Sequence, residues 1–148
     1  MKGKGLALAL LAAFLLYVVS LTLPAFECGT DRPFFRFAGS DDPLGVLILG
    51  FGWLGLMVGE VRWLTNLPFL IMVVHLACPR WKMRLVYPVA AAPLALSCVF
   101  IPARACGASY DLSHSLAIGG YLWVTAVLAV SLIYTLQLTE QSRLQSAS

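Results

Sequence analysis

Residues 50–55 read Gly-Phe-Gly-Trp-Leu-Gly, which matches the G-x-G-x-x-G fingerprint of dinucleotide-binding loops. The fingerprint binds a nucleotide only between a strand and a helix of a soluble domain, with an acidic residue about 20 positions later. In this chain the corresponding region, residues 70–74, is entirely apolar. We therefore interpret Gly52, Gly55 and Gly59 as a helix-packing face, because small residues let another helix approach closely. No cofactor is predicted.

Two of the four cysteines, Cys28 and Cys106, fall in segments that we place outside the membrane. An oxidising compartment such as the periplasm permits a disulfide there, so the sequence predicts a Cys28–Cys106 bridge. The sequence contains no C-x-x-C pair, which a thiol-disulfide enzyme uses to resolve its intermediates. We therefore interpret the bridge as structural.

His75 precedes Cys78 by three residues, a spacing that suggests a metal pair or a proton relay. Structural zinc sites take four protein ligands and catalytic ones three, and the other histidine, His114, lies in an expected outer loop, whereas His75 lies in the second span. We expect His75 to bond a backbone carbonyl or to contact lipid headgroups. No metal site is predicted. The polar residues at 111–115 lack a second acid or an oxyanion motif, so no catalytic residues and no enzymatic activity are predicted.

Glu60, Arg62 and Asn66 interrupt an otherwise apolar region. Ionisable groups beside membrane segments are candidates for function by default, so these three residues define a candidate polar cleft. The alternative is that they lie at headgroup level, with Trp63 as an aromatic anchor.

The elements that position these residues are predicted from hydrophobicity. The chain is 60% hydrophobic and 11% charged, which is typical of an integral membrane protein and leaves no room for a soluble domain. The predicted fold class is an all-α membrane protein, one domain over residues 1–148, with four transmembrane helices. Their expected bounds are residues 5–24, 63–78, 84–102 and 117–138. The net charge of +3 is scattered, so nucleic acid is not an expected partner.

Residues 44–60 form a further apolar stretch, and we expect it to be a half-inserted or interfacial helix on the outer side. Two full crossings between residues 44 and 78 would need roughly 40 residues at 1.5 Å each. The alternative is that residues 44–60 cross the membrane and residues 67–78 are the half-inserted part.

Loop charges predict the orientation, because Lys and Arg near the ends of spans stay on the cytoplasmic side. Lys2 and Lys4 place the N-terminus inside, and the basic cluster at residues 79–84 belongs on the same side. The chain must then cross an even number of times between them. Both termini are therefore predicted to lie in the cytoplasm, with the protein in a bacterial inner membrane.

Three patterns resemble small, uncharacterised bacterial four-span inner-membrane proteins. They are Leu-x-Leu-Pro-Ala at residues 21–25, Gly52-Trp53 followed by Trp63 and Asn66, and Gly-Tyr-Leu-Trp at residues 120–123. The resemblance implies topology and no activity. In the last pattern we expect Tyr121 and Trp123 to form an outer aromatic belt, and the glycines at 119–120 to allow a close approach or a bend.

The sequence favours a non-enzymatic protein that binds another membrane component. Two roles fit: an immunity protein against a membrane-targeting toxin, or an accessory or assembly subunit of a membrane complex. Besides the bilayer, we expect a protein partner or a homo-oligomer. The candidate outer-loop binding residues are Arg32, Phe34, Phe35 and Arg36, because exposed aromatic and Arg side chains are enriched in binding hot spots. The alternative is a small transporter or channel subunit with a polar path near Glu60, Arg62 and Asn66.

Overall fold

The computed structural model describes residues 3–27, 46, 49–50, 61–78, 84–100 and 115–146. Most of them are helical, and the all-α class is confirmed. The helices are α1 (Gly3–Thr22), α3 (Asn66–Ala77), α4 (Val86–Phe100) and α5 (Ile118–Ser146), and the 3-10 turn η2 (Arg62–Thr65) leads directly into α3. Two short strands, β1 (Phe26–Glu27) and β2 (Ser115–Leu116), pair with each other.

Prolines set two of the helix ends. α1 stops at Thr22, two residues before Pro24, because the residue that precedes a proline is disfavoured in helical conformation. α3 stops at Ala77 for the same reason, since Cys78 precedes a proline and has φ −128° and ψ 82°. α4 keeps Pro93 inside the helix.

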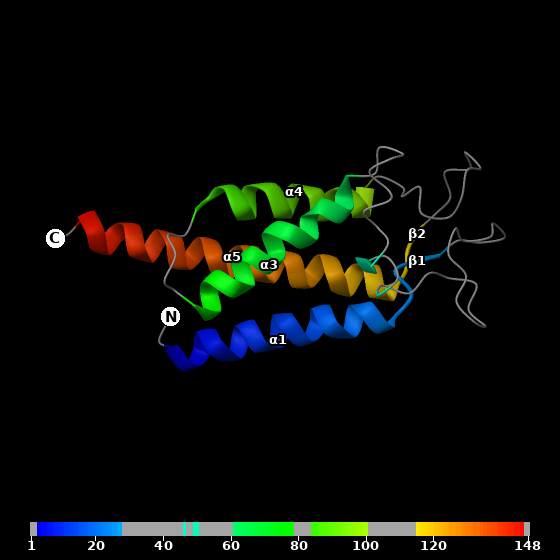
Figure 1. Ribbon diagram of the computed structural model, residues 1–148, viewed down its shortest axis with the longest axis horizontal. Helices are drawn as coiled ribbons and strands as arrows, with labels where there is room; N and C mark the ends of the chain where they lie inside the picture. Colours follow the sequence, from blue (N-terminus) through cyan, green and yellow to red (C-terminus); the bar gives the residue numbers. More distant parts are fainter. Residues whose placement is uncertain are drawn as a thin grey trace.

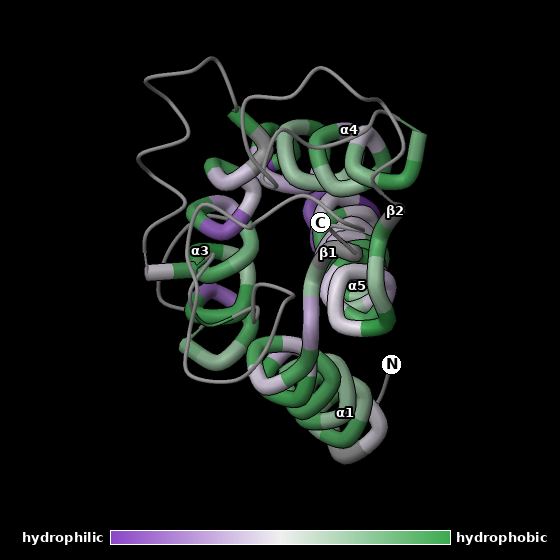
Figure 2. The backbone as a smooth tube through the Cα atoms, turned by 90° about the vertical axis from the view of Figure 1, so that its right-hand side faces the viewer, coloured by the Kyte–Doolittle hydropathy of each residue, from purple (hydrophilic) through white to green (hydrophobic). Residues whose placement is uncertain are grey.

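The four helices lie roughly side by side, with both termini at one end and the paired strands at the other (Figure 1). α1 and α4 run toward the strand end, whereas α3 and α5 run away from it (Figure 1). Viewed along the bundle, α5 lies between α1 and α4, and α3 covers the side of this layer (Figure 2). α5 accordingly contacts all three other helices, and α3 also contacts α4.

The core follows the inner faces of these helices and contains many small side chains. Ala91 and Ala95 of α4 are fully buried, as is Ala126 of α5, and such residues allow close helix approach. The largest fully buried side chains are Tyr134, Phe69 and Met72.

The outer faces of the helices also carry many apolar residues, and Figure 2 shows hydrophobic colour over most of α1 and over much of α3 and α4. Large apolar side chains are exposed on every helix, for example Leu8 at 69%, Val74 at 50%, Val89 at 60% and Leu132 at 62%. Two helices, α1 over Gly5–Thr22 and α5, are long and apolar enough to cross a membrane. The segments Trp63–Ala77 and Val86–Phe100 are shorter apolar helices.

The helices lie where the sequence predicts apolar spans, with one difference at the C-terminus. α5 continues through Ser146 and thus extends eight residues beyond the expected end at 138, because residues 139–146 include good helix formers such as Glu, Gln, Arg and Leu. The predicted helix over residues 44–60 lies outside the described residues, except for Val46, Leu49 and Gly50, which are helical. The choice between its two alternative placements therefore stays open.

The structure describes two of the four cysteines. Cys28 and Cys106 lie outside the described residues, so the predicted bridge has no structural support. Cys78 is an exposed thiol at the end of α3. Cys98 is buried in α4, and its thiol donates to the Leu94 carbonyl oxygen over 3.6 Å.

Candidate functional site

Asn66 is the first residue of α3, and its side chain connects three parts of the bundle. It is only 5% exposed. Its amide Nδ2 donates to the Trp63 carbonyl oxygen at 3.1 Å, and its Oδ1 accepts hydrogen bonds from Tyr17 Oη at 3.2 Å and Trp123 Nε1 at 3.0 Å. One amide therefore joins α1, η2 and α5. We call Tyr17, Trp63, Asn66 and Trp123 the Asn66 cluster.

Aromatic rings shield the Asn66 cluster. The rings of Tyr17 and Phe69 stack with centroids 4.4 Å apart and planes at 22°. Trp63 Nε1 donates to the carbonyl oxygen of Leu49 at 2.9 Å, which extends the cluster to residue 49. In such a low-dielectric setting each hydrogen bond is strong, and a donor or acceptor that loses its partner is costly.

The end of α1 and the start of α5 are joined beside the Asn66 cluster. Phe26 pairs with Leu116 and Glu27 with Ser115 in an antiparallel ladder. Two more backbone hydrogen bonds follow toward the helices. The Ala117 N–H donates to the Ala25 carbonyl oxygen at 3.1 Å, and the Gly119 N–H donates to the Pro24 carbonyl oxygen at 2.9 Å. We call this connection, residues 24–27 with residues 115–119, the clasp.

Gly119 is required for the clasp. A Cβ at this position would lie 2.5 Å from the Pro24 carbonyl oxygen and 2.8 Å from that of Leu23, both of them backbone atoms. At the next residue, Gly120, a Cβ would likewise lie 2.5 Å from a backbone atom, the Ala25 carbonyl oxygen. The close approach expected from the glycine pair is therefore confirmed.

A second polar group lies near the other end of α3. His75 is 3% exposed, and its Nδ1 lies 3.1 Å from the Tyr134 hydroxyl oxygen. The same hydroxyl accepts the backbone N–H of Arg84 at 3.0 Å, just before α4 begins. The Tyr87 ring meets the imidazole edge-on with centroids 5.5 Å apart. We call His75, Arg84, Tyr87 and Tyr134 the His75 cluster.

His75 has a hydrogen-bond partner that the sequence did not predict. The sequence suggested a backbone carbonyl or headgroups, whereas the observed partner is a tyrosine hydroxyl on α5. Both α3 and α5 run away from the strand end, and α3 crosses α5 obliquely (Figure 1). His75 of α3 and Tyr134 of α5 meet in the contact between these two helices. Only the packing of the helices reveals this pair.

The side chains that bond within the two clusters are those of asparagine, histidine, tyrosine and tryptophan. Within the described ranges no group of three His, Cys, Asp or Glu side chains is placed to hold a metal ion. Among the described residues, two buried hydroxyls, Thr65 Oγ1 and Ser131 Oγ, make no hydrogen bond. The chemistry that the two clusters offer is hydrogen bonding between helices.

The candidate polar cleft is only partly visible. Asn66 does not line an open cleft, because its amide is buried and bonded within the bundle. Arg62 begins η2, but its side chain and all of Glu60 lie outside what the structure describes. The other candidate residues lie outside the described ranges: Gly52, Gly55 and Gly59 of the packing face, and Arg32, Phe34, Phe35 and Arg36 of the outer loop.

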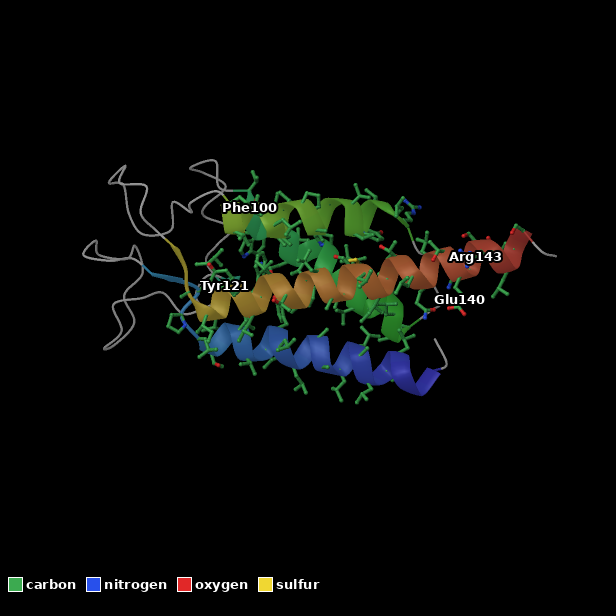
Figure 3. The ribbon with its side chains drawn as sticks, turned by 180° about the vertical axis from the view of Figure 1, so that it is seen from behind. Phe100, Tyr121, Glu140 and Arg143 are labelled. Atoms are coloured by element: carbon green, nitrogen blue, oxygen red, sulfur yellow. The ribbon has the colours of Figure 1, made fainter. Side chains whose placement is uncertain are left out.

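The two residues of the predicted aromatic belt point in different directions. Tyr121 is 51% exposed at the strand end of α5, as expected for a belt residue (Figure 3). Trp123 instead turns inward and donates to Asn66. Two residues separate their directions by roughly 200° around a helix, so the two side chains cannot share one face.

Sequence reasoning missed the connection between Tyr17, Asn66 and Trp123, although it had singled out two of the three. The Trp63 and Asn66 pair and the Gly-Tyr-Leu-Trp pattern were noted as separate features, and they meet in one cluster. Tyr17 gave the available signal, since a phenol in the middle of an apolar span needs a polar partner. Comparison of the chain with family models, with curated proteins and with solved structures finds no match.

Proposed function

We propose that this chain is a non-enzymatic membrane protein that binds another membrane component, either as an immunity protein or as an accessory subunit. The observation that carries the proposal is the Asn66 cluster. All three hydrogen bonds of the Asn66 amide go to groups of the same bundle. The most polar side chain of the helical core thus serves to hold helices together, which is the property of a scaffold.

The location of the polar groups along α5 supports membrane insertion. Exposed Tyr121 and Glu140 lie toward opposite ends of this helix (Figure 3). At 1.5 Å per residue, α5 rises about 28 Å between them. That rise is close to the roughly 30 Å of a bilayer's hydrocarbon core. The polar side chains exposed between them are Thr125 and Thr139, and each donates to a carbonyl oxygen of its own helix, that of Tyr121 and that of Leu136.

The basic residues support an orientation with both termini in the cytoplasm of a bacterial inner membrane. Arg143 is exposed at the end of the bundle where both termini lie (Figure 3). Arg84 is also exposed, and it closely precedes α4, which begins at that end (Figure 1). Lys4 occupies the first turn of α1 at the same end. Basic residues at one end of a helical membrane protein favour the cytoplasmic side.

Cysteine labelling tests this orientation. A variant that keeps Cys78 and replaces the other three cysteines by Ser carries one exposed thiol at the proposed cytoplasmic end. We expect a membrane-impermeant maleimide to label it in inverted vesicles and not in intact cells. The matched control adds Tyr121→Cys to a chain without other cysteines, and its labelling should be reversed. Equal labelling of both variants from one side would refute a membrane-crossing α5.

Purification in mild detergent tests the binding role. We expect a stoichiometric partner to accompany the chain, and a Phe34→Ala/Phe35→Ala double variant to lose it while keeping the same unfolding midpoint. As a control, Leu8→Ala on the exposed face of α1 should retain the partner. A chain that purifies alone, with no partner in any lipid condition, would contradict the proposal.

Transport is the second candidate, and the burial of Asn66 argues against it. A path along Glu60, Arg62 and Asn66 needs polar groups that face water, whereas the Asn66 amide is enclosed. Reconstituted vesicles decide between the two. A wild-type conductance that Glu60→Gln abolishes would establish transport. We expect no conductance from the wild type or from Glu60→Gln.

A further inference from the structure

We propose that the His75 cluster is a proton-operated latch, in which neutral His75 keeps the start of α4 docked on α5. The latch consists of the Arg84 backbone N–H, the Tyr134 hydroxyl and the His75 imidazole, bonded in that order. It goes beyond the proposed binding function and does not depend on the identity of any partner.

The protons of the cluster can be assigned by counting donors and acceptors. Arg84 N can only donate, so the Tyr134 oxygen accepts this bond at 3.0 Å. The side chain of Tyr134 is fully buried, so its single hydroxyl proton needs an acceptor within the protein. Nδ1 of His75, 3.1 Å away, is the acceptor that the geometry offers. His75 therefore carries its own proton on Nε2.

Protonation of His75 breaks this arrangement. An imidazolium ion carries a proton on both ring nitrogens, so Nδ1 changes from an acceptor into a donor. The Tyr134 oxygen then faces two N–H donors, and its own proton loses its acceptor inside the bundle. A buried polar group without a partner is unfavourable, so the three-membered chain of bonds is weakened. The bond to the Arg84 N–H is the one that ties the residue just before α4 to α5.

The imidazole lies among aromatic rings. The rings of Tyr87 and Tyr134 flank it, with centroids at 5.5 Å and 6.2 Å. The titratable and charged groups that the described parts of α3, α4 and α5 bring to this end are Cys78, Arg84, Glu140 and Arg143, and all four side chains are exposed. Of these, only Glu140 is acidic, and it lies about 9 Å along α5 from Tyr134.

Nuclear magnetic resonance of the full-length, ¹⁵N-labelled protein in lipid nanodiscs tests the latch. At about pH 8 we expect the Nε2–H tautomer of His75 and a protected Arg84 amide. Lowering the pH to about 5, across the range in which histidines change charge, should protonate His75. The protection factor of the Arg84 amide, corrected for its intrinsic exchange rate, should fall about tenfold at the same pH, as expected for the loss of one hydrogen bond.

Three variants separate the latch from a purely structural contact. Tyr134→Phe should leave the Arg84 amide unprotected at every pH. His75→Gln keeps an acceptor for the Tyr134 hydroxyl but cannot gain a charge, so the amide should stay protected at low pH. Tyr87→Phe, the matched control, retains the ring and should retain the pH response. An Nδ1–H tautomer at high pH, an Arg84 amide that ignores the protonation of His75, or a His75 that stays neutral throughout would each overturn the proposal.

Discussion

The Asn66 and His75 clusters connect the same two helices, α3 and α5, near opposite ends, and they do so with different chemistry. The Asn66 amide does not titrate, and it bonds two side chains and one backbone carbonyl from three elements. The His75 cluster depends on one hydroxyl that serves two partners, one of them a ring that can gain a proton. The strand end is therefore fixed chemically, whereas the end with the termini can respond to its environment.

Among the changes that test this comparison, removal of the Asn66 amide should lower the stability of the protein most. Asn66→Leu keeps the approximate size of the side chain but leaves Tyr17 Oη and Trp123 Nε1 without an acceptor. We expect about 3 kcal/mol of destabilisation, at about 1–3 kcal/mol for each orphaned group less some relaxation. The unfolding midpoint in mixed SDS micelles measures it. A midpoint within error of the wild type would show that the Asn66 cluster contributes nothing to stability.

The clasp should be the next most sensitive feature at the strand end. Gly119→Ala places a Cβ against two backbone carbonyl oxygens, so α1 and α5 must separate. We expect a loss of about 2 kcal/mol by the same unfolding assay, since forced overpacking typically costs about 1–3 kcal/mol. Gly5→Ala is the matched control, because its Cβ meets nothing within 4 Å. Equal stability of the two variants would contradict the close contact.

Tyr17→Phe should have a smaller effect than either change. It removes one of the two bonds to Asn66 Oδ1 but preserves the ring that stacks on Phe69. Trp123 remains as a donor to Asn66, so no acceptor is orphaned. We expect about 1 kcal/mol or less, in line with hydrogen bonds between membrane helices. A loss as large as that of Asn66→Leu would mean that the stacking geometry also depends on the hydroxyl.

Ser131→Ala should change stability least. The buried Ser131 hydroxyl makes no hydrogen bond, so its removal costs no interaction and relieves an unsatisfied polar group. We expect a change within about 0.5 kcal/mol, neutral or slightly stabilising. Ser20→Ala serves as the comparison, since the Ser20 hydroxyl is bonded to the Tyr17 carbonyl oxygen at 2.6 Å. A clear destabilisation by Ser131→Ala would reveal a partner for this hydroxyl.

Hydrophobicity alone predicted the helical class and the positions of the four helices. It could not predict which helices contact each other, because apolar residues surround both α1 and the part of α5 before residue 139, so the sequence carries little directional pattern. The inward turn of Trp123 and the bond between His75 and Tyr134 depend on that packing. The extension of α5 beyond residue 138 was missed for a different reason, since residues 139–146 are polar and hydrophobicity marks where a span ends, not where a helix ends.

The clasp has a consequence for biosynthesis. α1 is made first, yet the carbonyl groups of Pro24 and Ala25 bond to residues 119 and 117, which are synthesised more than 90 residues later. The inner face of α1 packs along α5, so it gains its principal neighbour only after the last helix has left the ribosome. The nascent chain must therefore hold its first helix in the membrane without its final contact, and a chain truncated before residue 115 never completes the bundle.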